Sequence, residues 1–193
     1  MIILWTKGHA SFESLHPKNQ KEEKRWAKNR LQAFRGSRRH FFRALVSDRL
    51  KEEGFHATLV SSIHKHQYRG ADLIRIDEEE ICTRDPNNPS NEGKLFFQDY
   101  LMVIYTREYA SQEYLHATGR DVQYSRDGFG RPNRPTSHTR MIPQVSFLRR
   151  NQSISAVINS SGQIRNPKSI MTYGYWAWER FAEQLPLDYF PEE

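Results

Sequence analysis

The chain has 193 residues, and its 29 Lys and Arg against 23 Asp and Glu give a formal net charge of +6. Its 12% aromatic content is too high for a disordered chain, and its 37% hydrophobic content indicates an aromatic core beneath a solvated exterior. The lone Cys82 excludes intramolecular disulfides and cysteine-based zinc sites, and the apolar run Met1–Trp5 is too short for a signal peptide or a membrane span, so we expect a soluble chain without an export signal.

The first predicted helix covers residues 17–35 and follows an irregular N-terminus, residues 1–11. Pro17 suits the first helical turn, where its missing N–H is no loss. One narrow stripe at helical spacing, i, i+4, i+5 and i+8, is made of Trp26, Arg30, Leu31 and Phe34. We therefore expect this helix to pack through one side.

A second helix is predicted over residues 38–53, with Ser37 as its N-cap. Its apolar residues recur at helical spacing and predict a buried face: Phe41, Phe42, Leu45, Val46 and Leu50. Gly54 stands where a helix end requires a left-handed residue. We expect it to close a Schellman motif in which Phe55 contacts Leu50.

Beyond Gly54 the pattern changes to that of β-strands. The strongest strand candidate, residues 95–106, is rich in aromatic and β-branched residues, although so short an apolar run is also compatible with a helix. Further strands are predicted over residues 55–59, 73–76, 144–148 and 153–158. By composition, residues 84–93 are a loop and residues 159–162 are a turn.

Two further segments complete the predicted architecture. Residues 119–143 carry Gly, Pro, Ser and five Arg with almost no aliphatic residue, which predicts a long exposed loop. A C-terminal helix is predicted from an apolar stripe that ends before Pro186 and is made of Trp178, Phe181, Ala182 and Leu185. We therefore expect residues 1–193 to form a single α+β domain, with two N-terminal helices and a C-terminal helix packed on a small, mostly antiparallel sheet. Because the two ends carry the largest helical stripes, we expect them to meet.

Charge is distributed unevenly along the chain. Residues 1–54 carry a net charge of +7, whereas residues 71–100 carry −5. A basic segment can contact phosphates, dock on an acidic segment of the same chain or simply face solvent, and the last two alternatives are the more common. The nucleic-acid alternative is a cytosolic protein that binds through Arg38, Arg39 and Arg43.

Two features are candidate ligand-binding surfaces. The Arg-rich segment offers planar, bidentate donors to an anionic partner through Arg126, Arg131, Arg134 and Arg140, although a solubilising loop has the same composition. The aromatic run at residues 173–178 could stack on a sugar or a base, most readily through Tyr175 or Trp176. The alternative for this run is a place in the core, since Trp178 belongs to the helical stripe.

The search for catalytic and metal motifs finds no specific pattern. His64 and His66 would share one face of a strand with His56, an arrangement that zinc or copper can use. Eight histidines in a chain of this length also produce such spacing by chance, so a metal-dependent enzyme using these three remains the weakest reading. Zincin, nucleophile-elbow, P-loop and Rossmann patterns are absent, and we expect neither an enzyme nor a cofactor.

Two blocks of sequence resemble a known family. Residues 16–55 and 162–191 resemble, in the same order, a module of the Bacteroidota envelope proteins called carboxypeptidase-like regulatory domain-containing proteins. Residues 174–179 (GYWAWE) and 185–189 (LPLDY) carry most of the match. The likeness runs from about Phe12 onward and is poorest in the Arg-rich segment.

The resemblance implies a non-enzymatic binding or scaffolding module in the cell envelope, either periplasmic or associated with the outer membrane. Its partner would be an envelope protein or a surface glycan. In such proteins a signal peptide and a transthyretin-like β-sandwich precede the module. We find neither here, so Met1 would begin a truncated product, be a misassigned start or begin a naturally reduced version. If Met1 is the native start, a cytoplasmic location is expected instead. The family name refers to the β-sandwich and implies no peptidase activity.

Overall fold

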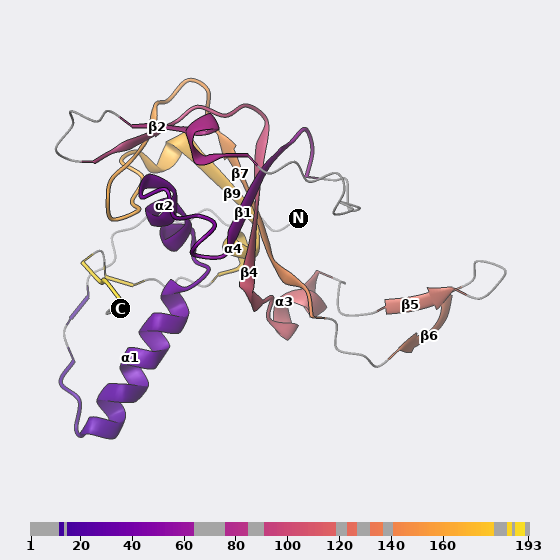
Figure 1. Ribbon diagram of the computed structural model, residues 1–193. Coiled ribbons are helices and arrows are strands. Elements are labelled where there is room, and N and C mark those ends of the chain that lie inside the picture. The colour runs from indigo at the N-terminus through magenta and orange to yellow at the C-terminus, as the bar shows by residue number, and fades with distance from the viewer. Residues whose placement is uncertain are drawn as a thin grey trace.

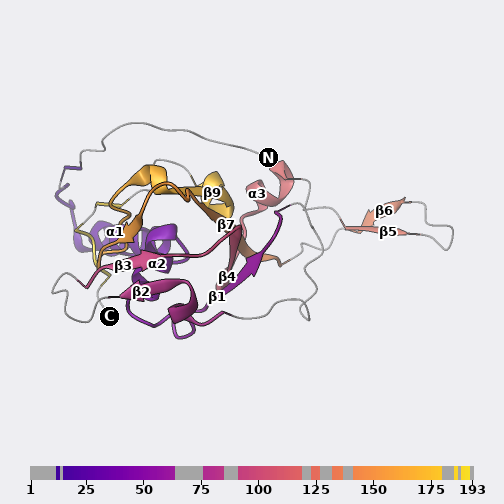
Figure 2. The same ribbon diagram turned by 90° about the horizontal axis from the view of Figure 1, so that it is seen from above.

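The computed structural model describes residues 12–13, 15–63, 76–84, 91–118, 123–126, 132–136, 141–179, 185–186 and 188–191. Within these residues the fold is α+β, as the sequence predicts: a four-stranded antiparallel sheet and a three-stranded antiparallel sheet surround a core that one helix covers (Figures 1 and 2). No helix in the described ranges is long and apolar enough to cross a bilayer.

Three of the four described α-helices begin after residues whose side chains cap them. These three are α1 Gln20–Phe34, α2 Arg38–Val46 and α3 Gln112–Ala117, whereas α4 Tyr175–Trp178 follows Gly174. Two short 3₁₀ helices are η2 Glu78–Glu80 and η3 Pro167–Ser169. The Asn19 side chain accepts from the Glu22 N–H at 2.9 Å, and Ser37 accepts from the His40 N–H at 3.1 Å. Both predicted N-terminal helices are therefore present, the first beginning three residues after Pro17.

The second helix is shorter than predicted. It ends at Val46 rather than at residue 53, because the Arg84 guanidinium donates to the Val46 carbonyl at 2.8 Å and Asp48 adopts a left-handed φ of 54°. The Schellman geometry predicted at Gly54 is nevertheless formed, with the Phe55 N–H donating to the Leu50 carbonyl at 2.8 Å. It closes the turn that follows α2 and leads directly into the first strand.

The four-stranded sheet has the order β1-β4-β7-β9, with every neighbouring pair antiparallel. Its strands are β1 Phe55–Val60, β4 Tyr100–Tyr109, β7 Pro143–Arg150 and β9 Ile170–Gly174. The three-stranded sheet has the order β2-β3-β8, with β2 Cys82–Arg84, β3 Gly93–Leu95 and β8 Ala156–Ile158. The predicted strands at 55–59, 144–148 and 153–158 are confirmed in kind, the last over its final three residues.

Two strand predictions have other outcomes. The segment 95–106 is divided, because Leu95 ends β3, and Asp99 adopts a left-handed φ of 53° before β4 begins. Residues 73–75 of the predicted strand lie outside the described residues, and Ile76 is not in a strand. Most of the predicted loop at 84–93 also lies outside them.

The Arg-rich segment is not simply a loop. Strands β5 Gln123–Arg126 and β6 Pro132–Thr136 pair there as a two-stranded antiparallel ribbon, and Pro143 already begins β7. In both ribbon views this pair lies well away from the rest of the fold (Figures 1 and 2). A two-stranded ribbon that lies away from the core can form without aliphatic residues. The low aliphatic content of residues 119–143 therefore led to the prediction of a loop.

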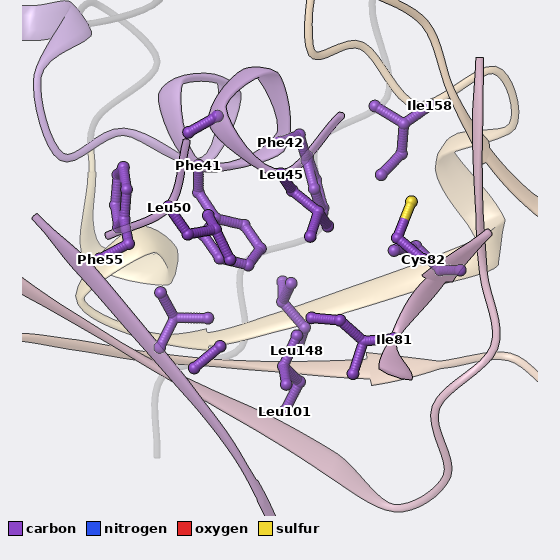
Figure 3. Packing of buried hydrophobic residues seen from close by; sticks show 14 of the residues in the cluster. Phe41, Phe42, Leu45, Leu50, Phe55, Ile81, Cys82, Leu101, Leu148 and Ile158 are labelled. Carbon is purple, nitrogen blue, oxygen red and sulfur yellow. The ribbon is translucent and has the colours of Figure 1, made fainter. Parts of the chain in front are cut away.

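The core lies between α2 and the two sheets, and Figure 3 shows α2 side chains meeting those of the strands. Phe41, Phe42 and Leu45 of α2 are fully buried. They meet apolar residues of the strands and turns, which include Leu50, Phe55, Ile81, Leu95, Leu101, Leu148 and Ile158. The predicted apolar face of the second helix is therefore confirmed as the centre of the core.

Most of the predicted C-terminal helix, including Phe181 and Ala182, lies outside the described residues. Of its predicted stripe, Trp178 ends the one-turn helix α4, because Glu179 leaves the helical region, with φ −51° and ψ 129°. Within α4, Trp176 contacts the main core, whereas Trp178 packs on a second small cluster that contains Tyr114 and Leu115 of α3.

The ends of the chain meet, as expected, although not as packed helices. Tyr189 lies edge-on to Phe34, with ring centroids 6.1 Å apart. Phe34 is the residue of α1 that is buried, so the C-terminal residues cover the end of α1 where it joins α2.

Candidate functional site

A shallow groove of about 620 Å³ lies at one end of the four-stranded sheet. Its walls come from the approach to β4, the end of β7 and the start of β9, and its lining residues are Gln98, Asp99, Arg149, Arg150, Asn151, Gln152 and Met171. Arg149 pairs in register with Tyr100 on one side and Met171 on the other, so these three side chains share one sheet face. Their strand neighbours Leu101 and Leu148 point to the core, so this is the face opposite α2.

Two tyrosines lie on the same sheet face as Arg149, beside the residues that line the groove. Tyr100 and Tyr173 meet edge to face, with ring centroids 5.9 Å apart at 67°. The Arg149 guanidinium carbon lies 5.4 Å from the centroid of Tyr100. In the described part of the chain this guanidinium makes no hydrogen bond or ion pair, so its five donors face solvent above an aromatic ring.

The neighbouring groups are held in place by the backbone. Arg150 donates from Nε to the Phe97 carbonyl at 3.2 Å and from its terminal nitrogen to the Gln152 side chain. The Asn151 N–H donates to the Ser169 carbonyl at 2.8 Å, which fixes the turn after β7. Asp99 brings its carboxylate to the groove from a left-handed conformation, which Asp tolerates better than most residues.

The groove therefore offers planar polar groups next to aromatic faces. Its lining includes one carboxylate, two guanidinium groups and three amides. Such groups pair donors and acceptors with the vicinal hydroxyls of a sugar, and aromatic rings stack on the apolar faces of sugar rings. The lining has no histidine, cysteine, serine or second carboxylate that could form a nucleophile–base or acid–base pair.

The three arginines of the nucleic-acid alternative have partners inside the fold. Arg39 donates to the carbonyls of Ser161 at 3.1 Å, Pro186 at 2.6 Å and Tyr189 at 2.7 Å. These contacts were not predicted, because Pro186 and Tyr189 lie about 150 residues downstream of Arg39.

The other two arginines on α2 are also engaged. Arg43 lies over the ring of Phe190, 4.8 Å from its centroid, and near that of Phe34. Arg38 is exposed and donates to the Thr172 hydroxyl at 3.2 Å. The basic face of α2 therefore contacts the chain itself at all three positions.

The two aromatic candidates face different clusters, and neither lies in the groove. The position of Trp176 corrects the prediction that its ring stacks on a ligand. Trp176 is 7% exposed, its ring centroid lies 5.5 Å from that of Phe41, and its Nε1 donates to the Gly36 carbonyl at 2.6 Å. A ring so placed belongs to the core and is not available to stack on a ligand. Tyr175 is half-buried, 5.1 Å from Tyr114 in the second cluster.

The remaining predicted residues are only partly described. Arg126 lies on β5 and Arg134 on β6, whereas Arg131 and Arg140 lie outside the described residues. His56 is exposed on β1, and His64 and His66 also lie outside the described residues. Among the residues that are described, no group of three or more His, Cys, Asp or Glu could hold a metal ion.

Cys82 is a buried core thiol, and its chemistry is testable. Burial raises its pKa from 9.0 to about 11, which lowers the thiolate population near pH 8 about a hundredfold. We expect iodoacetamide to alkylate this single cysteine at least about a hundredfold more slowly in the folded protein than in concentrated guanidinium chloride. Mass spectrometry of timed samples measures both rates, and equal rates would contradict the buried placement.

Comparisons with protein-family models, with curated proteins and with solved structures found no match. The groove itself was not predicted from the sequence. Its one local signal is the polar run of residues 149–152 directly after the predicted strand at 144–148.

Proposed function

We propose that the chain is a non-enzymatic binding module of a bacterial cell-envelope protein, and that its groove binds a surface glycan. The observation that carries this proposal is the group of planar polar side chains around Arg149 and Tyr100 at the end of the sheet. The resemblance of residues 16–55 and 162–191 to the envelope module supports the location.

The chemistry of the groove favours an acidic glycan. Arg149 and Arg150 outnumber Asp99 among the charged lining residues, so the groove carries a net positive charge. The Arg150 guanidinium already donates to the Phe97 carbonyl. The planar guanidinium of Arg149 can instead donate two hydrogen bonds to a carboxylate or phosphate substituent of the glycan. A volume of about 620 Å³ accommodates one or two sugar rings.

Replacing Arg149 with glutamine is expected to weaken glycan binding about tenfold or more, because a charge-assisted hydrogen bond contributes about 1.5–3 kcal/mol. A printed panel of acidic and neutral bacterial glycans identifies the ligand, and calorimetry measures its affinity. The matched control is Arg30→Gln on the exposed side of α1, which removes the same charge far from the groove. This control should bind as the unaltered protein does.

The panel also tests the proposal itself. Absence of binding to every glycan, or equal losses in the Arg149 and Arg30 variants, would contradict a glycan site in the groove. Salt-dependent binding to duplex DNA that weakens when Arg38 loses its charge would instead support the nucleic-acid alternative.

A further inference from the structure

The C-terminal segment, residues 185–191, is held on the N-terminal helices as a bound peptide would be. Its described residues belong to no helix or strand. Arg39 donates from its two terminal nitrogens to the backbone carbonyls of Pro186 and Tyr189, at 2.6 and 2.7 Å. Contacts to main-chain carbonyls fix the path of a peptide whatever its side chains are, and here both carbonyls belong to a turn in which the Tyr189 N–H donates to the Pro186 carbonyl at 3.0 Å.

Side-chain contacts add selectivity for aromatic residues. Tyr189 packs edge-on against Phe34 of α1, and Phe190 lies under the guanidinium of Arg43. Asp188 interacts electrostatically with Arg39. An acidic residue followed by two aromatic residues is therefore the sequence that this surface fits.

The receiving surface keeps much of its support without the segment. Arg39 also donates from Nε to the Ser161 carbonyl at 3.1 Å, which fixes its guanidinium to the turn between β8 and η3. Arg43 lies 5.8 Å from the ring centroid of Phe34, a contact between α2 and α1 in which the segment takes no part. A surface held in this way by its own fold can accept a segment from outside.

Part of the docked segment stays exposed to solvent. Phe190 remains 49% exposed and Asp188 is exposed, so these two side chains are only partly covered by the surface that receives them. Segments with few buried contacts open at low free-energy cost, far below that of global unfolding. An equivalent peptide can then replace the segment.

We propose that the surface formed by Phe34, Arg39 and Arg43 is a binding site for an acidic–aromatic peptide in a turn, the conformation in which the Tyr189 N–H donates to the Pro186 carbonyl at 3.0 Å. The chain's own C-terminal segment fills this site, and the same segment of a second copy can fill it in its place. The tethered segment is present at an effective concentration of about millimolar, so it outcompetes a free peptide unless it is removed or weakened. This site is on α1 and α2 and does not depend on the groove.

The test uses a chain truncated after residue 184 and a fluorescein-labelled peptide of residues 183–193, EQLPLDYFPEE. Fluorescence anisotropy should show that the truncated chain binds this peptide at least about tenfold more tightly than the full chain does. Adding Arg39→Gln to the truncated chain should weaken binding about tenfold or more. Arg30→Gln and a scrambled peptide are the controls.

A second variant keeps the proposal testable if the truncated chain does not fold. The full chain with Tyr189→Ala and Phe190→Ala keeps its length but weakens the tethered segment, so it should bind the labelled peptide where the unaltered chain does not. Failure of a folded truncated chain, or of this folded double variant, to bind the peptide would overturn the proposal. Equal binding by the truncated chain and the intact chain would do the same.

Discussion

Replacing Gly162 with alanine is expected to lower the free energy of unfolding by about 3 kcal/mol. Gly162 has a left-handed φ of +77°, which costs a residue with a Cβ about 1 kcal/mol. An added Cβ would also stand 2.3 Å from the Arg39 carbonyl oxygen and 3.0 Å from the Arg43 nitrogen. Both are backbone atoms of α2, so the turn at residues 159–162 would have to move away from the helix.

Urea denaturation followed by circular dichroism measures this change. The matched control is Ser160→Ala in the same turn, because Ser160 is exposed and its free energy of unfolding should change by less than about 0.5 kcal/mol. The displaced turn would also move the Ser161 carbonyl away from Arg39, which links this glycine to the support of the peptide surface. A Gly162→Ala variant as stable as the Ser160→Ala control would show that the turn does not pack on α2 as described.

The start of α2 could be predicted because it depends on neighbouring residues. Ser37 caps the N–H three residues ahead, and this arrangement follows from the sequence order alone. The alternating pattern from Phe55 predicted β1 for the same reason, since strand periodicity is read within a few residues.

The ends of the same elements depend on distant residues. Helix α2 ends at Val46, whose carbonyl accepts a hydrogen bond from Arg84, 38 residues away in the sequence. Helix α4 ends at Trp178, and within it the Trp176 N–H donates to the Ser146 hydroxyl of β7 at 3.1 Å. No local pattern contains these partners, and the spacing of apolar residues therefore overestimated the length of α2.

The candidate site was missed for the same reason. Asp99, Arg149 and Met171 reach the groove from three different segments, and only the order and register of β4, β7 and β9 bring them together. Arg39 and Arg43 were recognised as a basic pair, but sequence cannot show that backbone carbonyls and aromatic rings of the C-terminal segment are their partners.

His40 is the second position where a large effect is expected. Its Nδ1 accepts from the Gly36 N–H at 3.1 Å, so the ring proton is on Nε2, which lies 3.2 Å from Glu53. The carbonyl of the same Gly36 accepts from Trp176. Replacing His40 with alanine leaves the Gly36 N–H without an acceptor and opens a cavity, and should lower the free energy of unfolding by about 3 kcal/mol.

The surroundings of His40 oppose its protonation. Burial lowers its pKa from 6.5, Glu53 partly counteracts this, and the charges of Arg43 and Arg107 lower it further. Phe55 and Tyr105 enclose the ring, with centroids 4.8 and 5.8 Å away. The folded state therefore holds a neutral imidazole whose Nδ1 lone pair is already used.

Because the folded-state pKa of His40 is lowered, the unfolded chain takes up a proton first as the pH falls. The stabilising contribution of His40 is complete above about pH 6.5, the unfolded value, and is lost below it until the folded protein is protonated as well. Glu108 acts in the opposite direction, since burial raises its pKa and its contribution weakens as the pH rises. Comparison with a variant that lacks only the histidine separates the two groups.

His40→Asn is that variant, because its side-chain oxygen can still accept from the Gly36 N–H but does not titrate. At neutral pH it should recover at least about 1 kcal/mol of the loss caused by His40→Ala. Between about pH 7.5 and 5.5 its free energy of unfolding should fall less than that of the unaltered protein, whereas His56→Asn on the exposed side of β1 should keep the full fall. The contradicting result is a free energy of unfolding that falls as steeply with acid in His40→Asn as in the unaltered protein. His40 would then not be held neutral in the folded state. The hydrogen bond from the Gly36 N–H to its Nδ1 could not be the contact that joins α1 to α2.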